Sequence, residues 1–420
     1  MVGIIAFIFV FGVVVVVHEF GHFYVAKKSG VRVREFAIGM GPKLFQTRRN
    51  GTTYTIRVLP VGGYVRMAGR AEMEDSPIRP GMTAVIVLND VQEVTRINLS
   101  ETTELVGGQT LTINAVDLVD ALTIEGYLGG NDEELVTFKV DHDATIIESD
   151  GTELLIAPRD THLESAKLWQ RAAINFAGPF MNFVLAVVLF VGLAFAIPGV
   201  TTTTIDQAQK NMPAYQAGLR SGDTITKIND VKISSWQGMQ NVIQTKPGKQ
   251  VKITYTRKNV TKVVSVKIKT LKNQGQKIGQ IGITAQLTKS IGARLQYGIN
   301  TSTQAFTQIF TAIKNLISAP SLNQLGGPVS IYKTTSTVST YGFLALLSFM
   351  AWLSVNLGLL NLFPIPALDG GKLVLNLIEA IIRRPIPDKV ETGVTIAGAI
   401  LLVILMVAVT GNDIVRYFIK

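Results

Sequence analysis

The sequence contains no cysteine among its 420 residues. This absence excludes disulfide frameworks, thiolate metal sites and thiol nucleophiles. Charge is also scarce, because charged residues make up 17% of the chain while hydrophobic residues make up 47%. Without cysteine, any metal site must use His, Asp or Glu as its ligands. This composition predicts a membrane protein with attached soluble parts.

Four stretches are long and apolar enough to cross a hydrocarbon core of about 30 Å. The first lacks a basic leader and a clear cleavage site, so we interpret it as a span and not as a secretion signal. Basic residues gather after the first span and between the third and fourth. The excess of cations there predicts that both termini, and the segment between the second and third spans, lie outside the cytoplasm. The four stretches run approximately from Val2 to Ala26, Ala172 to Ile197, Phe343 to Phe363 and Val394 to Val409.

The fold class that these patterns predict is a polytopic α-helical membrane protein with four transmembrane helices. Three smaller β-rich parts are attached to them: a membrane-associated β-hairpin sheet, a cytoplasmic insertion and an extracytoplasmic domain. The segment after the second span is strongly basic, which favours an anionic lipid surface; no nucleic-acid motif accompanies it, so nucleic acid is not expected as a partner. His142 and His162 lie in polar surroundings and are expected to be solvated. The expected parts are the first span at 1–26, a membrane-associated β-hairpin region at 27–70, a cytoplasmic β-rich insertion of open role at 71–171, the second span at 172–198, a small extracytoplasmic β-rich domain at 199–288, an amphipathic helical connector at 289–342, the third span at 343–371, a cytoplasmic connection at 372–393, and the fourth span with the C-terminus at 394–420.

The stretch HEFGH lies inside the first apolar span. Its spacing places His18 and His22 one helical turn apart, so both imidazoles can reach one Zn²⁺, while Glu19 points to the adjacent side where the attacking water would sit. A charged side chain inside a span costs roughly 2.5 to 3.5 kcal/mol, and a structural Zn²⁺ site can return roughly 10 to 16 kcal/mol. Metal binding is therefore the simplest explanation of this cluster.

A catalytic zinc keeps three protein ligands, so a third ligand is expected at similar depth in another span. The third span ends in NLFPIPALDGGK, where Asp369 follows the apolar run directly. Pro364 and Pro366 break the helix, and the pair Gly370-Gly371 lets the backbone turn sharply, so Asp369 can swing back towards the metal. The sequence predicts Asp369 as the third ligand.

Three motifs together resemble those of the site-2 protease family of intramembrane zinc metalloproteases, particularly the bacterial RseP, RasP and Eep type. They are HEFGH in the first span, NFAGPFMNF at the start of the second and NLFPIPALDGG at the end of the third. The resemblance implies that His18, His22 and Asp369 bind Zn²⁺, and that Glu19 is the general base and then the proton donor. It also implies an active site within the membrane, towards its cytoplasmic side.

The resemblance extends to substrate binding. Asn361 corresponds to the asparagine that the family uses near the scissile peptide, and TIRVLPVGGYVRMAG resembles the membrane-reentrant hairpin beside the active site. An edge strand around Gly63 and Tyr64 would hold an unwound substrate by strand addition. The implied substrates are single-span membrane proteins, either anti-sigma factor remnants or leftover signal peptides, cut in regulated intramembrane proteolysis within membrane lipid.

The segment AGLRSGDTITKIND resembles the PDZ signature, so 199–288 is expected to be a single PDZ domain. Its IGQIGI loop, Ile278 to Ile283, resembles the loop that receives a peptide C-terminus, but the domain could equally filter substrates by size. Two other classes stay open. One is a PDZ-bearing membrane scaffold with a structural metal site; the other is a transporter, which would predict inverted repeats that the sequence does not show.

Overall fold

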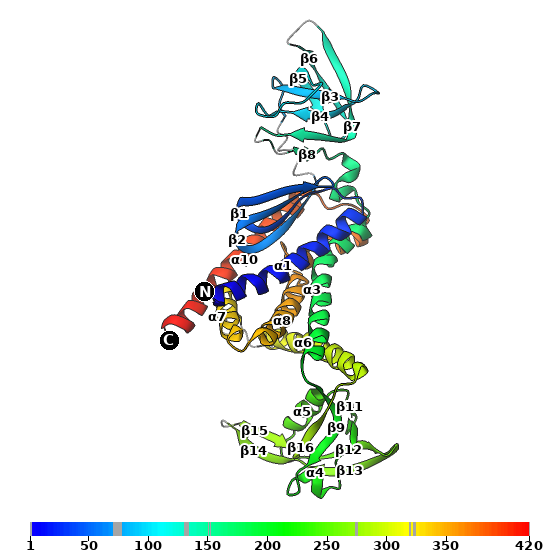
Figure 1. Ribbon diagram of the computed structural model, residues 1–420, viewed down its shortest axis with the longest axis vertical. Helices are drawn as coiled ribbons and strands as arrows, with labels where there is room; N and C mark the ends of the chain where they lie inside the picture. The colour runs from blue at the N-terminus through cyan, green and yellow to red at the C-terminus, as the bar shows by residue number, and fades with distance from the viewer. Residues whose placement is uncertain are drawn as a thin grey trace. The chain divides into compact units, whose positions relative to one another are not determined.

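The computed structural model describes residues 2–69, 78–129, 134–149, 151, 153–273, 276–318, 321 and 325–419. It separates into two compact units, shown in ribbon form in Figure 1. The first unit comprises Met1–Leu185, Ser321–Thr340 and Leu353–Lys420; the second comprises Ala186–Pro320 and Tyr341–Trp352.

The four expected apolar helices are present. Each is long and apolar enough to cross a membrane. The first has apolar residues around its whole circumference and is interrupted before its terminal lysines only by His18, Glu19 and His22. These helices are α1 (Val2–Lys28), α3 (Leu168–Ala196), α8 (Phe343–Asn361) and α10 (Asp388–Ile414).

Helix α3 packs tightly against both α1 and α8 in the first unit. A Cβ built on Gly21 of α1 would lie 2.3 Å from the carbonyl oxygen of Ala177, and one built on Gly358 of α8 would lie 3.0 Å from that of Pro179. Small residues allow helix backbones to approach this closely inside a membrane. The close crossings bring side chains of α1, α3 and α8 into one region.

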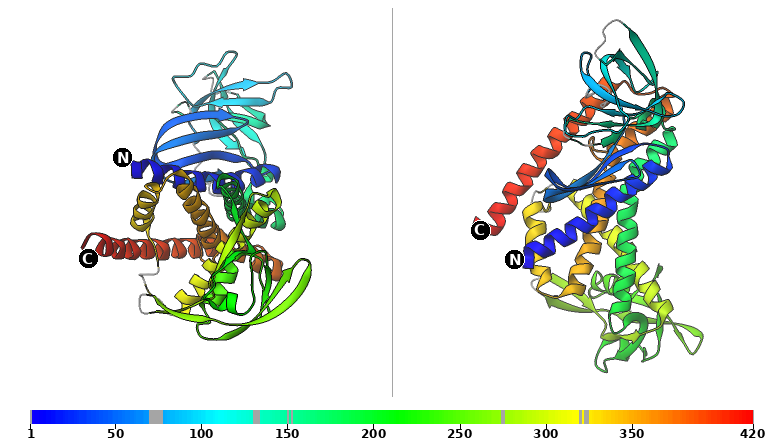
Figure 2. Two further views of the ribbon diagram at one scale, coloured as in Figure 1. Left: turned by 60° about the horizontal axis from the view of Figure 1, so that its bottom comes forward. Right: turned by 45° about the horizontal axis from the view of Figure 1, so that its top comes forward.

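Helix α7 (Pro328–Ser339) packs beside α1, as both views in Figure 2 show. Its N-terminus is capped from the end of α10, where Asp413 Oδ2 accepts hydrogen bonds from the backbone N–H groups of Gly327 at 2.9 Å and Ser330 at 3.0 Å. A carboxylate at a helix N-terminus satisfies otherwise unpaired donors and complements the helix dipole. Asp413 thus ties α10 to α7.

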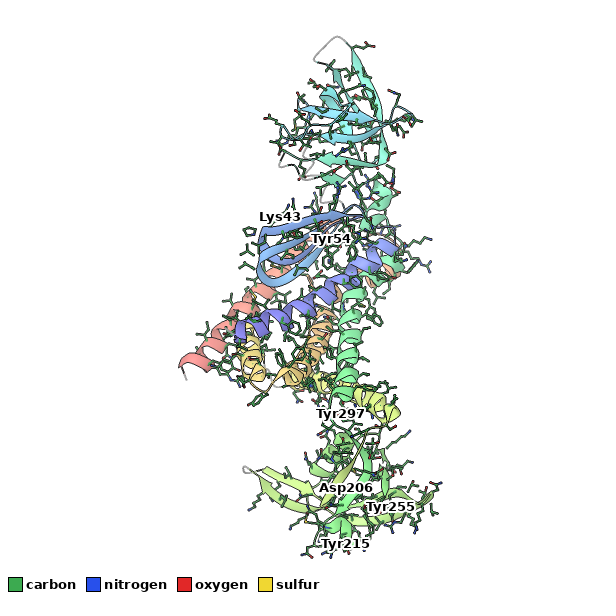
Figure 3. The ribbon with its side chains drawn as sticks, viewed as in Figure 1. Lys43, Tyr54, Asp206, Tyr215, Tyr255 and Tyr297 are labelled. Atoms are coloured by element: carbon green, nitrogen blue, oxygen red, sulfur yellow. The ribbon has the colours of Figure 1, made fainter. Side chains whose placement is uncertain are left out.

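The hairpin is built from β1 (Val33–Arg49) and β2 (Thr52–Met67), the curved sheet beside α1 in Figure 1. Ala37 pairs with Thr55 on one side and with Tyr64 on the other, so the first half of β1 lies between two arms of β2. In the described residues, the second arm of β2 pairs only with β1 and is an edge strand. Tyr54, labelled in Figure 3, packs with Phe23 of α1 at 5.9 Å between ring centroids and anchors the sheet on the helix.

The insertion is a six-stranded sheet in the order β4-β3-β5-β6-β7-β8, closed on itself because β4 also pairs in parallel with β7. Arg32 and Arg48 link it to the hairpin region, through Ile156 O at 2.7 Å and Glu153 at 3.1 Å respectively. Its core includes Ile86, Ile97 and Leu111. The strands are β3 (Thr83–Leu88), β4 (Val94–Asn98), β5 (Gln109–Asp117), β6 (Thr123–Leu128), β7 (Leu135–Ile147) and β8 (Glu153–Leu155).

One of the two histidines near this insertion differs from its expected state. The side chain of His142 is 47% exposed, as expected. The expectation for His162 was wrong, because the residue is only 2% exposed and its Nε2 lies 2.8 Å from the carbonyl oxygen of Ala157. It packs between the short helices η1 (Arg159–Thr161) and η2 (Leu163–Ser165), a compact turn that local polarity did not reveal.

The second unit holds a five-strand sheet path, β13-β12-β10-β9-β16, with a core around Ile205, Leu219 and Ile253. Figure 3 labels Tyr215 on α4 and Tyr255 on β12. Helix α6 packs against the start of α5, because Gln304 donates to Ser235 Oγ at 2.7 Å. The elements are β9 (Val200–Ala208), α4 (Pro213–Gln216), β10 (Thr224–Ile228), β11 (Val231–Lys232), α5 (Trp236–Gln244), β12 (Gln250–Arg257), β13 (Val260–Lys267), β14 (Lys269–Asn273), β15 (Gln276–Gln280), β16 (Ile283–Thr288) and α6 (Ile291–Ser318).

Candidate active site

The structure brings His18, His22 and Asp369 together. The Nε2 atoms of the two histidines lie 3.2 Å apart. Asp369 Oδ2, from the first residue of α9 (Asp369–Ile382), lies 3.2 Å from His18 Nε2 and 3.3 Å from His22 Nε2. The three potential ligand atoms all fall within 4.8 Å of one another.

This geometry fits a zinc ion. Two ligands at about 2.1 Å from a tetrahedral Zn²⁺ are separated by about 3.4 Å, close to each of the three observed separations. The two histidines are 7% and 8% exposed, so water cannot fully solvate ring nitrogens that face each other at this distance. The donor set, two imidazole nitrogens and one carboxylate oxygen, leaves the fourth position of a catalytic zinc open.

Asp369 reaches the histidines through a tight turn between α8 and α9, but the reason differs from the expected one. The expectation that Gly370 and Gly371 supply the turn was wrong, since both lie in the helical start of α9. The left-handed residue is Ala367, with φ 74°. The glycines are needed for space, because a Cβ on Gly370 would lie 2.2 Å from the carbonyl oxygen of Phe363.

The three ligand atoms open onto a cavity of about 800 Å³. Glu19 lines it from α1, and the edge strand of β2 contributes Gly63 and Tyr64. A Cβ on Gly63 would lie 3.3 Å from Glu19 Cγ, so the strand backbone runs directly beside the glutamate. Asn361 lines the cavity as well, with its Nδ2 3.3 Å from His18 Nε2. The cavity is therefore lined by all seven residues that the sequence predicted for catalysis, metal binding or substrate binding: His18, Glu19, His22, Gly63, Tyr64, Asn361 and Asp369.

A buried carboxylate holds the edge strand from within the sheet. Glu35 is 8% exposed and accepts hydrogen bonds from Thr55 at 2.6 Å, Arg57 at 2.7 Å and the hydroxyl of Tyr64 at 2.9 Å. Burial raises the pKa of Glu35, but these three donors outweigh it and leave the pKa below its ordinary value. Tyr64 thus turns its hydroxyl toward Glu35.

Helix α3 supplies contacts that sequence reasoning missed. His22 Nδ1 lies 2.7 Å from the carbonyl oxygen of Ile174, and His18 Nδ1 lies 3.2 Å from the side-chain amide of Asn182. The third ligand was expected among carboxylates and imidazoles, and α3 contains neither. The signal was Asn182, a polar amide in the apolar part of this helix.

The comparisons with known proteins decide the family. The model of peptidase family M50 matches residues 6–405. The chain belongs to this family. It is 46% identical over 422 residues, covering all of both chains, to an Enterococcus faecalis protein named "Probable protease eep". Proteins of Streptococcus pyogenes and Lactococcus lactis that carry "zinc metalloprotease" in their names are 44% and 41% identical, covering at least 99% of each chain.

This M50 peptidase is accordingly a site-2 protease family zinc metalloprotease, an enzyme with Zn²⁺ as its cofactor and a multi-pass membrane protein. Two solved structures of PDZ domains, of SdrC-like proteins from Listeria monocytogenes and Listeria innocua, also match. They are 28% and 31% identical, each covering 21% of this chain, and 88% and 93% of their own chains, with a TM-score of 0.18.

Proposed function

We propose that this M50 peptidase hydrolyses peptide bonds within the transmembrane segments of single-span membrane proteins, with His18, His22 and Asp369 as its zinc ligands. The observation that carries the proposal is the position of the cluster. Two of the three ligand atoms belong to α1, a helix long and apolar enough to cross a membrane. A peptide bond that reaches this site comes most directly from within the lipid.

The chemistry follows from which groups face the cavity. His18, His22 and Asp369 would hold Zn²⁺, which when bound would supply Lewis-acid activation of a water molecule and of the scissile carbonyl. Glu19 accepts a proton from the attacking water as the water oxygen bonds to the carbonyl carbon, and then delivers that proton to the leaving nitrogen as the C–N bond breaks. The side-chain amide of Asn361 donates a hydrogen bond to the polarised carbonyl oxygen.

The edge strand of β2 provides a means of holding the substrate. A transmembrane helix hides its peptide bonds in internal hydrogen bonds, so the segment to be cut must unwind. Strand addition along Gly63 and Tyr64 replaces the lost hydrogen bonds with new ones to the protein. The scissile bond is then extended beside Glu19, whose Cγ lies 3.3 Å from a Cβ position on Gly63.

The charges at the helix ends support an orientation. Lys27 and Lys28 end α1. Lys167 precedes α3, and Arg171 lies in its first turn. Arg383 and Arg384 precede α10. Under the positive-inside rule these ends face the cytoplasm, both termini lie outside, and so does the domain at 199–288, which we assign as PDZ. The active site then lies toward the cytoplasmic side. Anti-sigma factor remnants and leftover signal peptides, cut in regulated intramembrane proteolysis, have the required single span, and peptide C-termini are the ligands a PDZ domain takes.

The test is cleavage of a single-span protein reconstituted with the full chain in liposomes. Wild type should yield two products whose intact masses place the cut inside the transmembrane segment. Glu19→Ala should retain zinc and lose cleavage, and His18→Ala should lose both. Equal cleavage by wild type and Glu19→Ala would overturn the role of the glutamate, and products cut only outside the span would overturn the intramembrane proposal. Bound substrate without any cleavage by wild type would instead favour the scaffold.

A further inference from the structure

Helix α3 contacts both zinc-facing histidines on the sides of their rings away from Asp369. The Nδ1 atom of His22 lies 2.7 Å from the carbonyl oxygen of Ile174, and that of His18 lies 3.2 Å from the side-chain amide of Asn182. Both α3 groups are buried, and Asn182 is 0% exposed. Neither Nδ1 therefore depends on bulk water for a partner.

The tautomer of each ring decides which nitrogen can bind a metal. A neutral imidazole carries one proton, and a metal takes the lone pair of the other nitrogen. Because the Nε2 atoms of His18 and His22 both face Asp369, each Nδ1 must carry the proton and donate it. A carbonyl oxygen such as that of Ile174 can only accept, so it fixes the His22 tautomer directly.

Asn182 can do the same for His18 through its amide oxygen. Its Nδ2 is the atom nearer to His18 Nδ1, and its Oδ1 is buried with no hydrogen-bond partner among the residues that the structure describes. A half-turn of the planar amide about Cβ–Cγ exchanges the two atoms without a change of shape. Oδ1 then accepts the Nδ1 proton and leaves the Nε2 lone pair aimed at the metal.

We propose that Asn182 is a positioning residue for the zinc site, which sets the tautomer and the ring orientation of His18 by accepting its Nδ1 proton. The inference rests on the zinc ligands proposed above. Such outer hydrogen bonds hold ligand rings in place, and their loss lowers metal affinity by about 10- to 100-fold. Asn182 itself is held by α8, because its backbone carbonyl accepts a hydrogen bond from Ser354 Oγ at 2.8 Å.

The experiment measures zinc affinity, by chelator competition, and the visible absorption of the Co²⁺ form of the purified full chain in detergent. Asn182→Leu keeps the shape but cannot accept a proton, so zinc affinity should fall by about 10- to 100-fold and the Co²⁺ spectrum should change. Asn182→Asp restores an acceptor and should bind zinc within about threefold of wild type. Gln170→Leu is the matched control, an amide on the same helix that bonds Ser29 O and does not line the cavity, and should leave affinity unchanged.

Three outcomes would overturn the proposal: wild-type zinc affinity in Asn182→Leu, equal losses in the Asp and Leu variants, or an equal loss in Gln170→Leu. If Asn182→Leu does not fold, as judged by its melting transition without zinc, Asn182→Ala takes its place with the same expected loss. His18→Ala distinguishes a failure of the proposed zinc ligand set from a failure of the role of Asn182. If it binds zinc like wild type, the proposed ligand set is wrong; if it loses zinc while Asn182→Leu keeps it, only the role of Asn182 is wrong.

Discussion

Gly178 of α3 lies against His22 so closely that a Cβ at position 178 would be 2.2 Å from Nε2, the atom that faces Asp369. The same Cβ would lie 2.8 Å from Cε1 of His18. The absence of a side chain at this one position therefore leaves room for both imidazole rings. Any larger residue must push them out of the arrangement in which the three ligand atoms fall within 4.8 Å.

Gly178→Ala is expected to lower zinc affinity by at least tenfold and to abolish proteolysis, because the methyl group and the His22 ring cannot occupy the same space. Zinc content of the purified protein, measured by elemental analysis, checks this. Gly192→Ala on the same helix is the control, since a Cβ there meets nothing within 4 Å. Full zinc occupancy in Gly178→Ala would show that the rings can move aside without cost.

The cluster of His18, His22 and Asp369 illustrates what the sequence could predict. The four-residue spacing of His18 and His22 is a local pattern, and helical geometry alone converts it into a shared face. Asp369 was also predicted, because an apolar chain of this composition offers few carboxylates at membrane depth. The four apolar helices could also be predicted, because the length and hydropathy of each apolar run are properties of the local sequence.

The outer contacts of the cluster could not be predicted in the same way. His22 and Ile174 are 152 residues apart, and His18 and Asn182 are 164 apart. A backbone carbonyl carries no sequence signature, so its role depends entirely on how α1 and α3 cross. The function of Gly370 and Gly371 was misjudged for the same reason: their space requirement comes from carbonyl groups of the preceding loop, which periodicity does not report.

Gly63→Val is expected to reduce cleavage by about 10- to 100-fold while zinc binding is kept. A Cβ at this position would lie 2.8 Å from the carbonyl oxygen of Ala37 and 3.3 Å from Glu19 Cγ, so the edge strand must shift away from α1. Cleavage rates and zinc content measured on the same preparation separate the two effects. Gly12→Ala on α1, where a Cβ meets nothing within 4 Å, should change neither quantity.

Glu35→Gln is expected to lower the melting temperature at pH 7, and the difference from wild type should shrink as pH falls below 4.5. The folded-state pKa of Glu35 lies below its ordinary value of 4.5, because hydrogen bonds from Thr55, Arg57 and Tyr64 outweigh the effect of burial. A depressed carboxyl pKa stabilises the fold above the unfolded-state pKa, and the stabilisation is lost as pH falls through the folded-state pKa. Melting curves from pH 7 to pH 3 test this against Glu104→Gln, an exposed glutamate of the insertion. A wild-type advantage that is independent of pH would contradict the assignment.

Arg257→Met is expected to destabilise the domain between β9 and β16 without affecting the zinc site. Asp223 is 0% exposed and is paired with Arg257 through Oδ1 at 2.6 Å and Oδ2 at 2.7 Å. Removing the cation leaves a buried carboxylate without its charge partner, which costs about 3–5 kcal/mol.

Limited proteolysis of the full chain should therefore release fragments cut between 199 and 288 in Arg257→Met, at protease concentrations that leave wild type intact. Zinc content should stay at the wild-type level, because the proposed ligands His18, His22 and Asp369 belong to the other compact unit. Lys258→Met, at the exposed neighbouring position, should resist the protease like wild type, and equal resistance of Arg257→Met would show that the ion pair contributes little to this domain.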